Sequence, residues 1–432
     1  MKVLIISHNP VSTYHNMGKT MRALFSSFKK EELCQLYIYP TIPDIDYCSS
    51  YYRITDKDVL KSYYTFRVKG REIDKSEIKT ARQNIFQDEK DEALYRNKKN
   101  KKAYRMLARD IMWKCSAWYN KDLDAWLKRE TPTCIFVAPG TGKFLYDIAL
   151  KISKKYRLPI VDYICDDYYF VEKPKGLMNR IKQNLLSKKI EKLILRSSKL
   201  VLVCEELSEC YFEKFKVPCV TLMTGCNYPI AKDIAIREDP TSLTYMGNIR
   251  CNRFTSLSEI GRALDEINKE ENTNFSLRIY TGEKDEEILS VFRGVDSIKL
   301  CGFVSGEAFD KAFYESEVLL HVEAFDEQSI DWVRHSVSTK IADSLGSGIC
   351  MFAYAPNEVS SMRHLLRNDC AFAIDDPKAL KDGLKELFYN AEKRNQIAKQ
   401  GLLTARKYHD AAESGKTFYR EIESVHENIA NQ

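Results

Sequence analysis

The chain has 432 residues, a net charge of +6, 44% hydrophobic residues and 30% charged residues. This length exceeds one ordinary core and predicts two domains, and the composition is that of a soluble globular protein. No apolar run approaches the roughly 20 residues that cross a bilayer. The modest charge neither demands nor excludes a polyanion, and no nucleic-acid partner is expected.

The thirteen cysteines are scattered, with no CxxC pair and no Cys/His cluster at zinc spacing. The N-terminus begins directly with the strand-like run Lys2–Ile6 and shows no cleavable signal. We therefore expect reduced thiols, no bound metal, no cofactor and a cytoplasmic protein.

Short apolar runs alternate with helical patterns through the first half of the chain. The expected strands are Val3–Ile6, Leu36–Tyr39, Cys134–Val137, Pro159–Ile164, Leu200–Cys204 and Pro218–Met223. The segment 48–130 is charged and Tyr-rich, with a helix expected over 101–128, and it is interpreted as a helical elaboration. This order is typical of an α/β domain, which we place at residues 1–228.

The same order restarts after the turn-rich segment Thr224–Pro229. Expected strands are Leu243–Met246, Phe275–Tyr280, Ser297–Leu300, Val318–His321 and Ile349–Tyr354, with helices at Ser256–Ile267 and Ser338–Gly348 and a helical tail over 379–430. The pattern predicts an α/β protein with two Rossmann-like, doubly wound parallel-sheet domains facing a cleft. The second domain spans 229–405, and a C-terminal helix, 406–432, is expected to pack back toward the first.

The segment Ser338–Gly348 carries the clearest chemistry. Ser338 suits a helix N-cap, Gly348 suits a C-terminal stop, and Lys340 and Asp343 are three residues apart on one helix face. A cation in the first turn suits a phosphate, and the carboxylate suits ribose or sugar hydroxyls. A solvated ion pair on a surface helix is an equally open interpretation of these residues alone.

Several runs together resemble a known family. Arg196–Phe215 and Val217–Asn227 are similar to the end of the N-terminal domain in GT-B glycosyltransferases, and Leu243–Ile249 is similar to the first strand and glycine loop of their nucleotide-sugar domain. Cys301–Glu307 resembles the loop that flanks the donor base. Ser338–Gly348 resembles the donor helix of the family 4 (group 1) enzymes of polysaccharide biosynthesis.

The resemblance implies a nucleotide-sugar donor bound in the C-terminal domain. The donor-binding candidates are Gly247, Asn248, Arg250, Arg253, Phe303, Val304, Ser338, Thr339, Lys340 and Asp343. The family often carries two glutamates eight positions apart; here the second position is Asp343 and the first falls on His335. The pair Glu315 and Glu323 has the same spacing, but it straddles a strand and is treated as coincidence.

The catalytic candidates lie in the N-terminal domain. His8 follows the first strand, and Asp166 and Asp167 end another, where a carboxylate could orient or deprotonate an acceptor hydroxyl. Paired acids at strand ends also serve as helix caps, so both roles stay open. Gly18-Lys19-Thr20 lacks the earlier glycine of a phosphate loop, since position 13 is threonine.

Segment 173–199 carries nine Lys/Arg against one Glu beside an apolar stripe. A basic amphipathic helix suits an anionic membrane surface, so a peripheral position at the inner face of the plasma membrane is expected. The resemblance implies a retaining glycosyltransferase that acts on a glycan or lipid-linked acceptor in cell-surface polysaccharide synthesis, and the cationic residues expected at the donor site favour metal-independent transfer. A nucleotide-sugar epimerase or hydrolase, or a catalytically silent nucleotide-sugar-binding protein, remains an alternative on the same fold.

Overall fold

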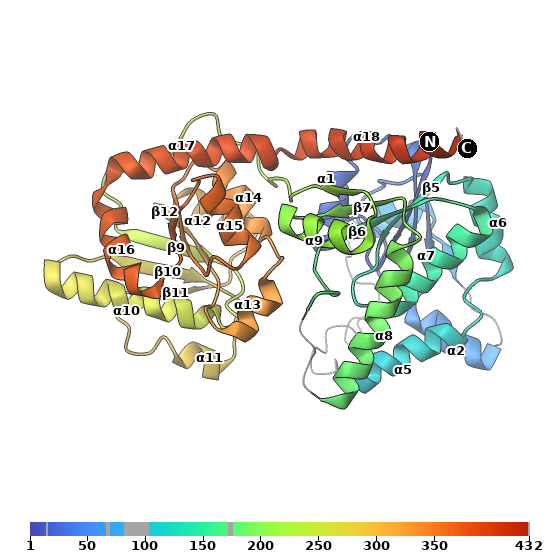
Figure 1. Ribbon diagram of the computed structural model, residues 1–432, viewed down its shortest axis with the longest axis horizontal. Coiled ribbons are helices and arrows are strands. Elements are labelled where there is room, and N and C mark those ends of the chain that lie inside the picture. Colours follow the sequence, from blue (N-terminus) through green and yellow to red (C-terminus); the bar gives the residue numbers. More distant parts are fainter. Residues whose placement is uncertain (14–15, 66–69, 82–102, 172–175, 431–432) are drawn as a thin grey trace. The chain divides into compact units, whose positions relative to one another are not determined.

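The computed structural model describes residues 1–13, 16–65, 70–81, 103–171 and 176–430. The chain forms two compact units (Figure 1): unit 1 comprises Met1–Leu222 and Ala412–Gln432, and unit 2 comprises Met223–Ala411. The sequence-based division at 228 lies six residues beyond the first of these boundaries. Each unit is built around its own parallel sheet.

Unit 1 contains an eight-stranded sheet in the order β4-β3-β2-β1-β5-β6-β7-β8. Its strands are β1 (Val3–Ser7), β2 (Leu33–Tyr37), β3 (Ser50–Arg53), β4 (Arg71–Glu72), β5 (Cys134–Ala138), β6 (Ile160–Ile164), β7 (Lys199–Leu202) and β8 (Cys219–Thr221). The inner strands are continuous apolar runs because helices cover both faces of the sheet. All pairs are parallel except the edge pair β3–β4, which is antiparallel. The chain reverses its direction of winding between β1 and β5, which defines a topological switch point.

The helices of unit 1 pack on this sheet. They are α1 (Asn16–Leu24), α2 (Asp56–Thr65), α3 (Lys75–Ala81), α5 (Ala103–Cys115), α6 (Lys121–Glu130), α7 (Lys143–Tyr156), α8 (Leu177–Ile194), α9 (Glu205–Phe215) and the C-terminal α18 (Ala411–Ala430), with a 3-10 turn at Lys30–Glu32. α18 joins the core of unit 1 through Phe418, whose ring centroid lies 5.1 Å from that of Phe25 and 5.5 Å from that of Phe136.

The single helix expected over 101–128 is wrong. The described part of this segment forms α5 and α6, which are separated by residues 116–120. Asn120 begins the second helix, because its side-chain oxygen accepts a hydrogen bond from the Leu123 N–H at 2.9 Å. Trp118 turns inward between the two helices and is 7% exposed.

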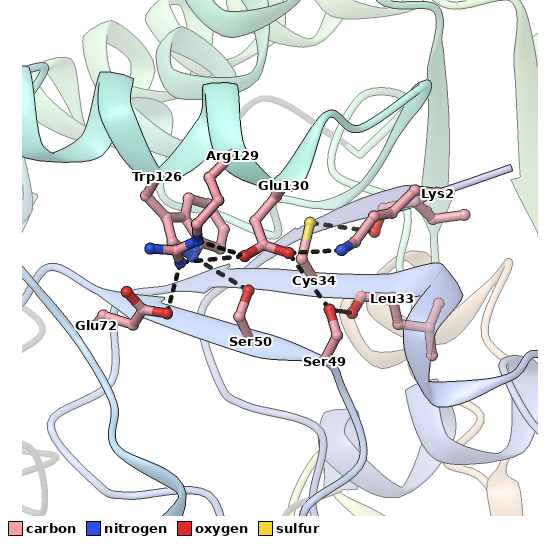
Figure 2. Close-up of polar contacts among 10 residues, drawn as sticks. Lys2, Leu33, Cys34, Ser49, Ser50, Glu72, Trp126, Arg129 and Glu130 are labelled. Atoms are coloured by element: carbon pink, nitrogen blue, oxygen red, sulfur yellow. Dashed lines mark hydrogen bonds and ion pairs between the residues drawn. The ribbon is translucent and has the colours of Figure 1, made fainter.

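Glu130, the last residue of α6, ties that helix to the sheet (Figure 2). Its carboxylate accepts hydrogen bonds from Lys2 Nζ at 2.6 Å and from Arg129 Nη2 at 3.1 Å. Burial alone would raise the pKa of Glu130, but the hydrogen bonds from Lys2, Ser50 and Arg129 hold it below its ordinary value. A buried carboxylate with this many donors fixes the approach of α6 to the amino end of β1.

Unit 2 contains a six-stranded sheet in the order β11-β10-β9-β12-β13-β14. Its strands are β9 (Ser242–Met246), β10 (Ser276–Tyr280), β11 (Ile298–Gly302), β12 (Val318–Val322), β13 (Met351–Tyr354) and β14 (Phe372–Ile374), and all of its pairs are parallel. The switch point falls between β9 and β12. The loops that follow these two strands are therefore the expected place for a ligand.

The helices of unit 2 are α10 (Arg253–Glu271), α11 (Glu286–Ser290), α12 (Glu307–Tyr314), α13 (Glu327–Val333), α14 (Thr339–Gly346), α15 (Ser360–Arg367), α16 (Leu380–Tyr389) and α17 (Ala391–Tyr408), with a 3-10 turn at Pro377–Ala379. The main core packs α10 and α16 against β9, β10 and β12 through residues such as Leu257, Leu264 and Leu384. Within the described residues no helix is both long and apolar enough to cross a membrane.

Candidate functional site

The switch point of unit 2 brings Gly247 and Lys340 together. Gly247 follows β9 with φ +146°, and an added Cβ there would lie 2.2 Å from Lys340 Nζ. Its N–H donates to the Tyr280 carbonyl at 2.9 Å, which fixes the loop against β10. Glycine is thus required by the backbone conformation, and the short distance shows that the end of the Lys340 side chain lies against the loop that follows the first strand.

Lys340 is half-buried, and its ammonium lies 4.7 Å from the centroid of the Tyr245 ring. Among the residues that the structure describes, no carboxylate forms an ion pair with it. Burial, and then the nearby charge of Arg253, lower the pKa of Lys340 to about 8. The ammonium is still the majority form at neutral pH. Unit 2 therefore holds a positive charge at its switch point, although the burial of that charge lowers the stability of the fold.

The other cations near this loop already have partners. Arg253 makes a two-pronged ion pair with buried Glu323, with N···O distances of 2.7 and 2.8 Å. Arg250 does the same with Glu283 at 2.6 and 2.9 Å, on the surface. Each pair is close to neutral, which leaves Lys340 as the cation best placed to attract a phosphate.

Asp343 contacts another part of unit 2. It accepts hydrogen bonds from the Asn227 N–H at 2.6 Å and from the Asn227 amide at 2.9 Å. A ribose hydroxyl would have to share the Asp343 carboxylate with these donors or displace them, so the expected ribose contact stays a prediction.

Ser338 begins α14 without a side-chain capping bond, and the Ile341 N–H bonds to the Ser338 carbonyl at 3.0 Å. The first N–H groups of α14, on Thr339 and Lys340, therefore have no acceptor within the helix.

The remaining donor candidates lie in loops at the same sheet edge. Phe303 is 74% exposed just beyond β11 and packs beside Gly282, while Val304 turns into a small apolar cluster. Asn248 folds its own loop, because its side-chain oxygen accepts the Arg250 N–H at 2.8 Å. An exposed aromatic ring at this edge has the form of a stacking surface for a nucleobase, and that role stays a prediction.

In unit 1, His8 follows β1 at the switch point. Its Nδ1 lies 2.8 Å from Asn9 Oδ1, and its Nε2 lies 3.4 Å from a guanidinium nitrogen of Arg109. Arg109 is a donor, so Nε2 accepts and Nδ1 carries the proton. Arg109 is anchored by an ion pair to Asp56 at 3.0 Å, and the same carboxylate accepts from the Trp113 indole at 2.7 Å.

The two neighbouring aspartates differ in surroundings. Asp167 accepts the N–H groups of Tyr169 and Phe170 at 2.9 and 3.0 Å and the Tyr211 hydroxyl at 3.2 Å, so it folds its own turn. Asp166 is exposed and accepts from the Tyr168 hydroxyl at 3.0 Å. Of the pair, Asp166 is the one whose carboxylate is open to an incoming hydroxyl.

A third aspartate lies deeper at the same strand end. Asp162 is 2% exposed, and its Oδ1 has no hydrogen-bond partner among the described residues. Burial raises its pKa to about 8, so the group is a neutral acid at pH 7. It lines a cavity of about 20 Å³ together with Gly140 and Tyr146, which is room for a single water molecule.

Sequence reasoning missed several residues at these two switch points. Glu323, whose spacing from Glu315 was treated as coincidence, forms an ion pair with Arg253 in unit 2. In unit 1, Lys143 opens α7 directly after a Gly140–Gly142 loop and pairs with Asp110 of α5 at 2.6 Å. A glycine-rich loop between a buried strand and a lysine at a helix start is a signal that the sequence does contain. Within the described residues, no group of three or more His, Cys, Asp and Glu could hold a metal.

No protein-family model matches the chain, and no curated protein matches it either. Solved structures do. A sucrose-phosphate synthase from Thermosynechococcus elongatus is 10% identical with a TM-score of 0.60, covering 98% of this chain and 100% of that one. Anabaena HepE in complex with UDP-glucose is 9% identical with a TM-score of 0.61, with 98% and 100% covered.

A UDP-forming alpha,alpha-trehalose-phosphate synthase from Burkholderia vietnamiensis is 11% identical with a TM-score of 0.60, covering 100% of this chain and 99% of that one. The agreement extends over the whole length of each protein, through both parallel-sheet units. The expected GT-B fold is therefore confirmed. At these identities the likeness establishes fold, and the activity has to be argued from the site.

Proposed function

We propose that this chain is a glycosyltransferase that takes a sugar from a nucleotide-sugar donor and passes it to a glycan or lipid-linked acceptor in cell-surface polysaccharide synthesis. The observation that carries the proposal is Lys340, a cation without a carboxylate partner among the described residues, held against the Gly247 loop at the switch point of unit 2. The GT-B fold and the UDP-glucose bound by HepE support a nucleotide-sugar donor.

The site supplies positive charge where a departing diphosphate would develop negative charge. The ammonium of Lys340 and the first N–H groups of α14 would bind the diphosphate oxygens. This arrangement supports metal-independent transfer, since positive charge is already built into the protein. The resemblance of Ser338–Gly348 to the family 4 donor helix supports retention of the anomeric configuration.

The acceptor would bind in unit 1 at the switch point between β1 and β5. Exposed Asp166 is the group that could orient or deprotonate an acceptor hydroxyl, and His8 could do so if the hydroxyl displaces the Arg109 guanidinium from its Nε2.

A second candidate function is nucleotide-sugar binding without transfer. One observation favours it: Asp343, at the position of the second family glutamate, is hydrogen-bonded by Asn227 through both carboxylate oxygens. A carboxylate held in this way has less capacity to hold the donor sugar.

Product analysis separates these functions. The full chain is incubated with a panel of UDP-, GDP-, ADP- and dTDP-sugars, alone and with glycan or lipid-linked acceptors, and released nucleotide and sugar products are separated. Transfer to an acceptor by the wild type and by Lys232→Met, but not by Lys340→Met, is the expected result. Lys232 is an exposed lysine elsewhere in unit 2, so it controls for loss of one charge. Free sugar from the donor alone would indicate a hydrolase, and binding without any product would indicate the silent alternative.

We also propose that the region 173–199 contacts an anionic membrane surface. Residues 172–175 lie outside the described residues, and α8 begins at Leu177. The proposal is supported by four apolar side chains that α8 exposes in its first half: Leu177, Met178, Ile181 and Leu185. Exposed apolar groups on a basic helix are typical of peripheral membrane contacts.

A further inference from the structure

A large basic groove lies on unit 1 among α5, α7 and α8, and none of the residues discussed as donor or acceptor contacts lines it. Its volume is about 680 Å³. The three helices contact one another; α5 and α8 line the groove near their C-terminal ends, and α7 lines it from Asp147 to Lys154. Six cationic side chains line it: Lys114, Lys151, Lys154, Lys189, Lys192 and Arg196.

The charge of this groove is not balanced by the protein. Its lining holds one carboxylate, Asp147, which forms an ion pair with Lys189. The other five cations form no ion pair within the described chain. Lysines often end helices, because each helix C-terminus carries about half a negative charge. Three such ends offset about one and a half charges, which leaves roughly three and a half positive charges for a ligand.

The groove is separate from the acceptor crevice of unit 1. Helices α7 and α8 each follow one parallel strand and lead into the next, so they run antiparallel to the sheet. Their C-terminal ends therefore lie at the amino ends of the strands, whereas His8 and Asp166 follow the carboxyl ends. An anion in the groove would not be the reacting part of the acceptor.

One face of α8 connects the groove to exposed apolar side chains. In its first half this face carries Leu177, which is 77% exposed, and Met178, Ile181 and Leu185. At helical spacing the same face continues through Lys189, Lys192 and Arg196 into the groove, where Leu195 is 68% exposed. A soluble anion would use only the cations, whereas a lipid surface would use both halves, with phosphates beside the lysines and the apolar side chains at the headgroup boundary.

We propose that the groove and the exposed face of α8 together form a docking site for an anionic phospholipid surface, with lipid phosphates seated among Lys151, Lys154 and Lys192. The inference rests on the membrane-contact part of the proposed function and not on glycosyl transfer. Loss of docking would therefore leave transfer to a water-soluble acceptor intact, and an enzyme without transfer activity could still dock.

The test is co-sedimentation of the full chain with phosphatidylcholine vesicles, with and without phosphatidylglycerol. Binding only to the anionic vesicles is expected for the wild type. Lys151→Glu combined with Lys192→Glu should weaken that binding by at least about 25-fold, since each basic residue near an anionic surface contributes about fivefold. The matched control, Lys121→Glu with Lys214→Glu, makes the same charge change at two exposed lysines of unit 1 outside the groove and should bind nearly as the wild type does.

Two further variants complete the test: the first checks that the fold is intact, and the second distinguishes a lipid surface from a soluble phosphate. Lys151→Gln with Lys192→Gln removes charge without reversing it, and an unchanged thermal transition confirms that the variant is folded. Leu177→Ser should weaken docking to vesicles without changing the binding of soluble glycerol phosphate. Equal losses in the groove and control variants, equal binding to neutral vesicles, no vesicle binding at all, or full displacement by glycerol phosphate would each overturn the proposal.

Discussion

Replacing Lys340 with methionine should stabilise the protein while removing the cation that we propose binds the donor diphosphate. The pKa of Lys340 is lowered from 10.5 to about 8, mainly by burial. A shift of that size corresponds to about 3 kcal/mol by which the fold disfavours the ammonium. Methionine keeps the length of the side chain without the charge. The variant also loses the cation's contact with the Tyr245 ring, which costs about 1 kcal/mol of stability. A net gain of about 2 kcal/mol in the free energy of unfolding is therefore expected.

The gain should depend on pH with a definite sign. Below pH 8 the lysine is charged in both the folded and unfolded states, so the full penalty is present. Between pH 8 and about 10.5 the folded state loses its proton first, and the penalty disappears. The advantage of Lys340→Met in the free energy of unfolding should therefore be largest near pH 7 and vanish near pH 10.5.

Denaturant unfolding of unit 2 across this pH range, followed alongside thermal melts, measures the effect. Near pH 7 a gain of about 2 kcal/mol corresponds to roughly 4–8 °C for a domain of this size. Lys232→Met should not change stability measurably, because its side chain is exposed. A Lys340→Met protein that is less stable than the wild type at pH 7, or equally more stable at every pH, would refute the assignment of a desolvated cation.

Three further substitutions test neighbouring features. Gly247→Ala should cost about 1–3 kcal/mol of stability, because alanine is strained at a φ of +146°. It should also weaken nucleotide binding, because its Cβ would lie 2.2 Å from Lys340 Nζ and displace the ammonium. Normal stability in melts would contradict this geometry. Asp162→Asn should raise stability above about pH 4, most strongly near pH 8, because the buried acid has a pKa of about 8 and must stay protonated in the fold; a flat difference in unfolding free energy from pH 4 to 8 would argue against it. Arg253→Met should cost about 3–5 kcal/mol by leaving Glu323 buried and unpaired, and adding Glu323→Leu should recover much of that loss; a double variant no better than the single one would show that the ion pair is not the cause.

The strands of both sheets could be predicted because β1, β5 and β12 are continuous apolar runs, the form that a strand buried on both faces takes. The short strands β3, β4 and β14, at or next to a sheet edge, were missed, since their few residues carry no periodic signal. The break between α5 and α6 was missed because apolar spacing continues through residues 116–120.

In the candidate site, too, local patterns could be predicted from the sequence, whereas contacts between distant residues could not. Lys340 could be proposed from the sequence because a lysine in the first turn of a helix is a local pattern, and its role stays a prediction. The partner of Asp343 is Asn227, 116 residues away, and that of Arg253 is Glu323, 70 residues away. Such partners follow only from the packing of the sheet, so the sequence could propose these side chains but not the contacts that already hold them.

Calorimetric titration of a panel of nucleoside diphosphates, UDP, GDP, ADP and dTDP, into the full chain tests the central claim most directly. The account predicts that at least one of them binds the wild type and Lys232→Met alike, and binds Lys340→Met about 10- to 100-fold more weakly, because a charge-assisted contact contributes about 1.5–3 kcal/mol. Binding that survives unchanged in Lys340→Met, or no binding of any diphosphate to the wild type, would contradict a donor site at this lysine.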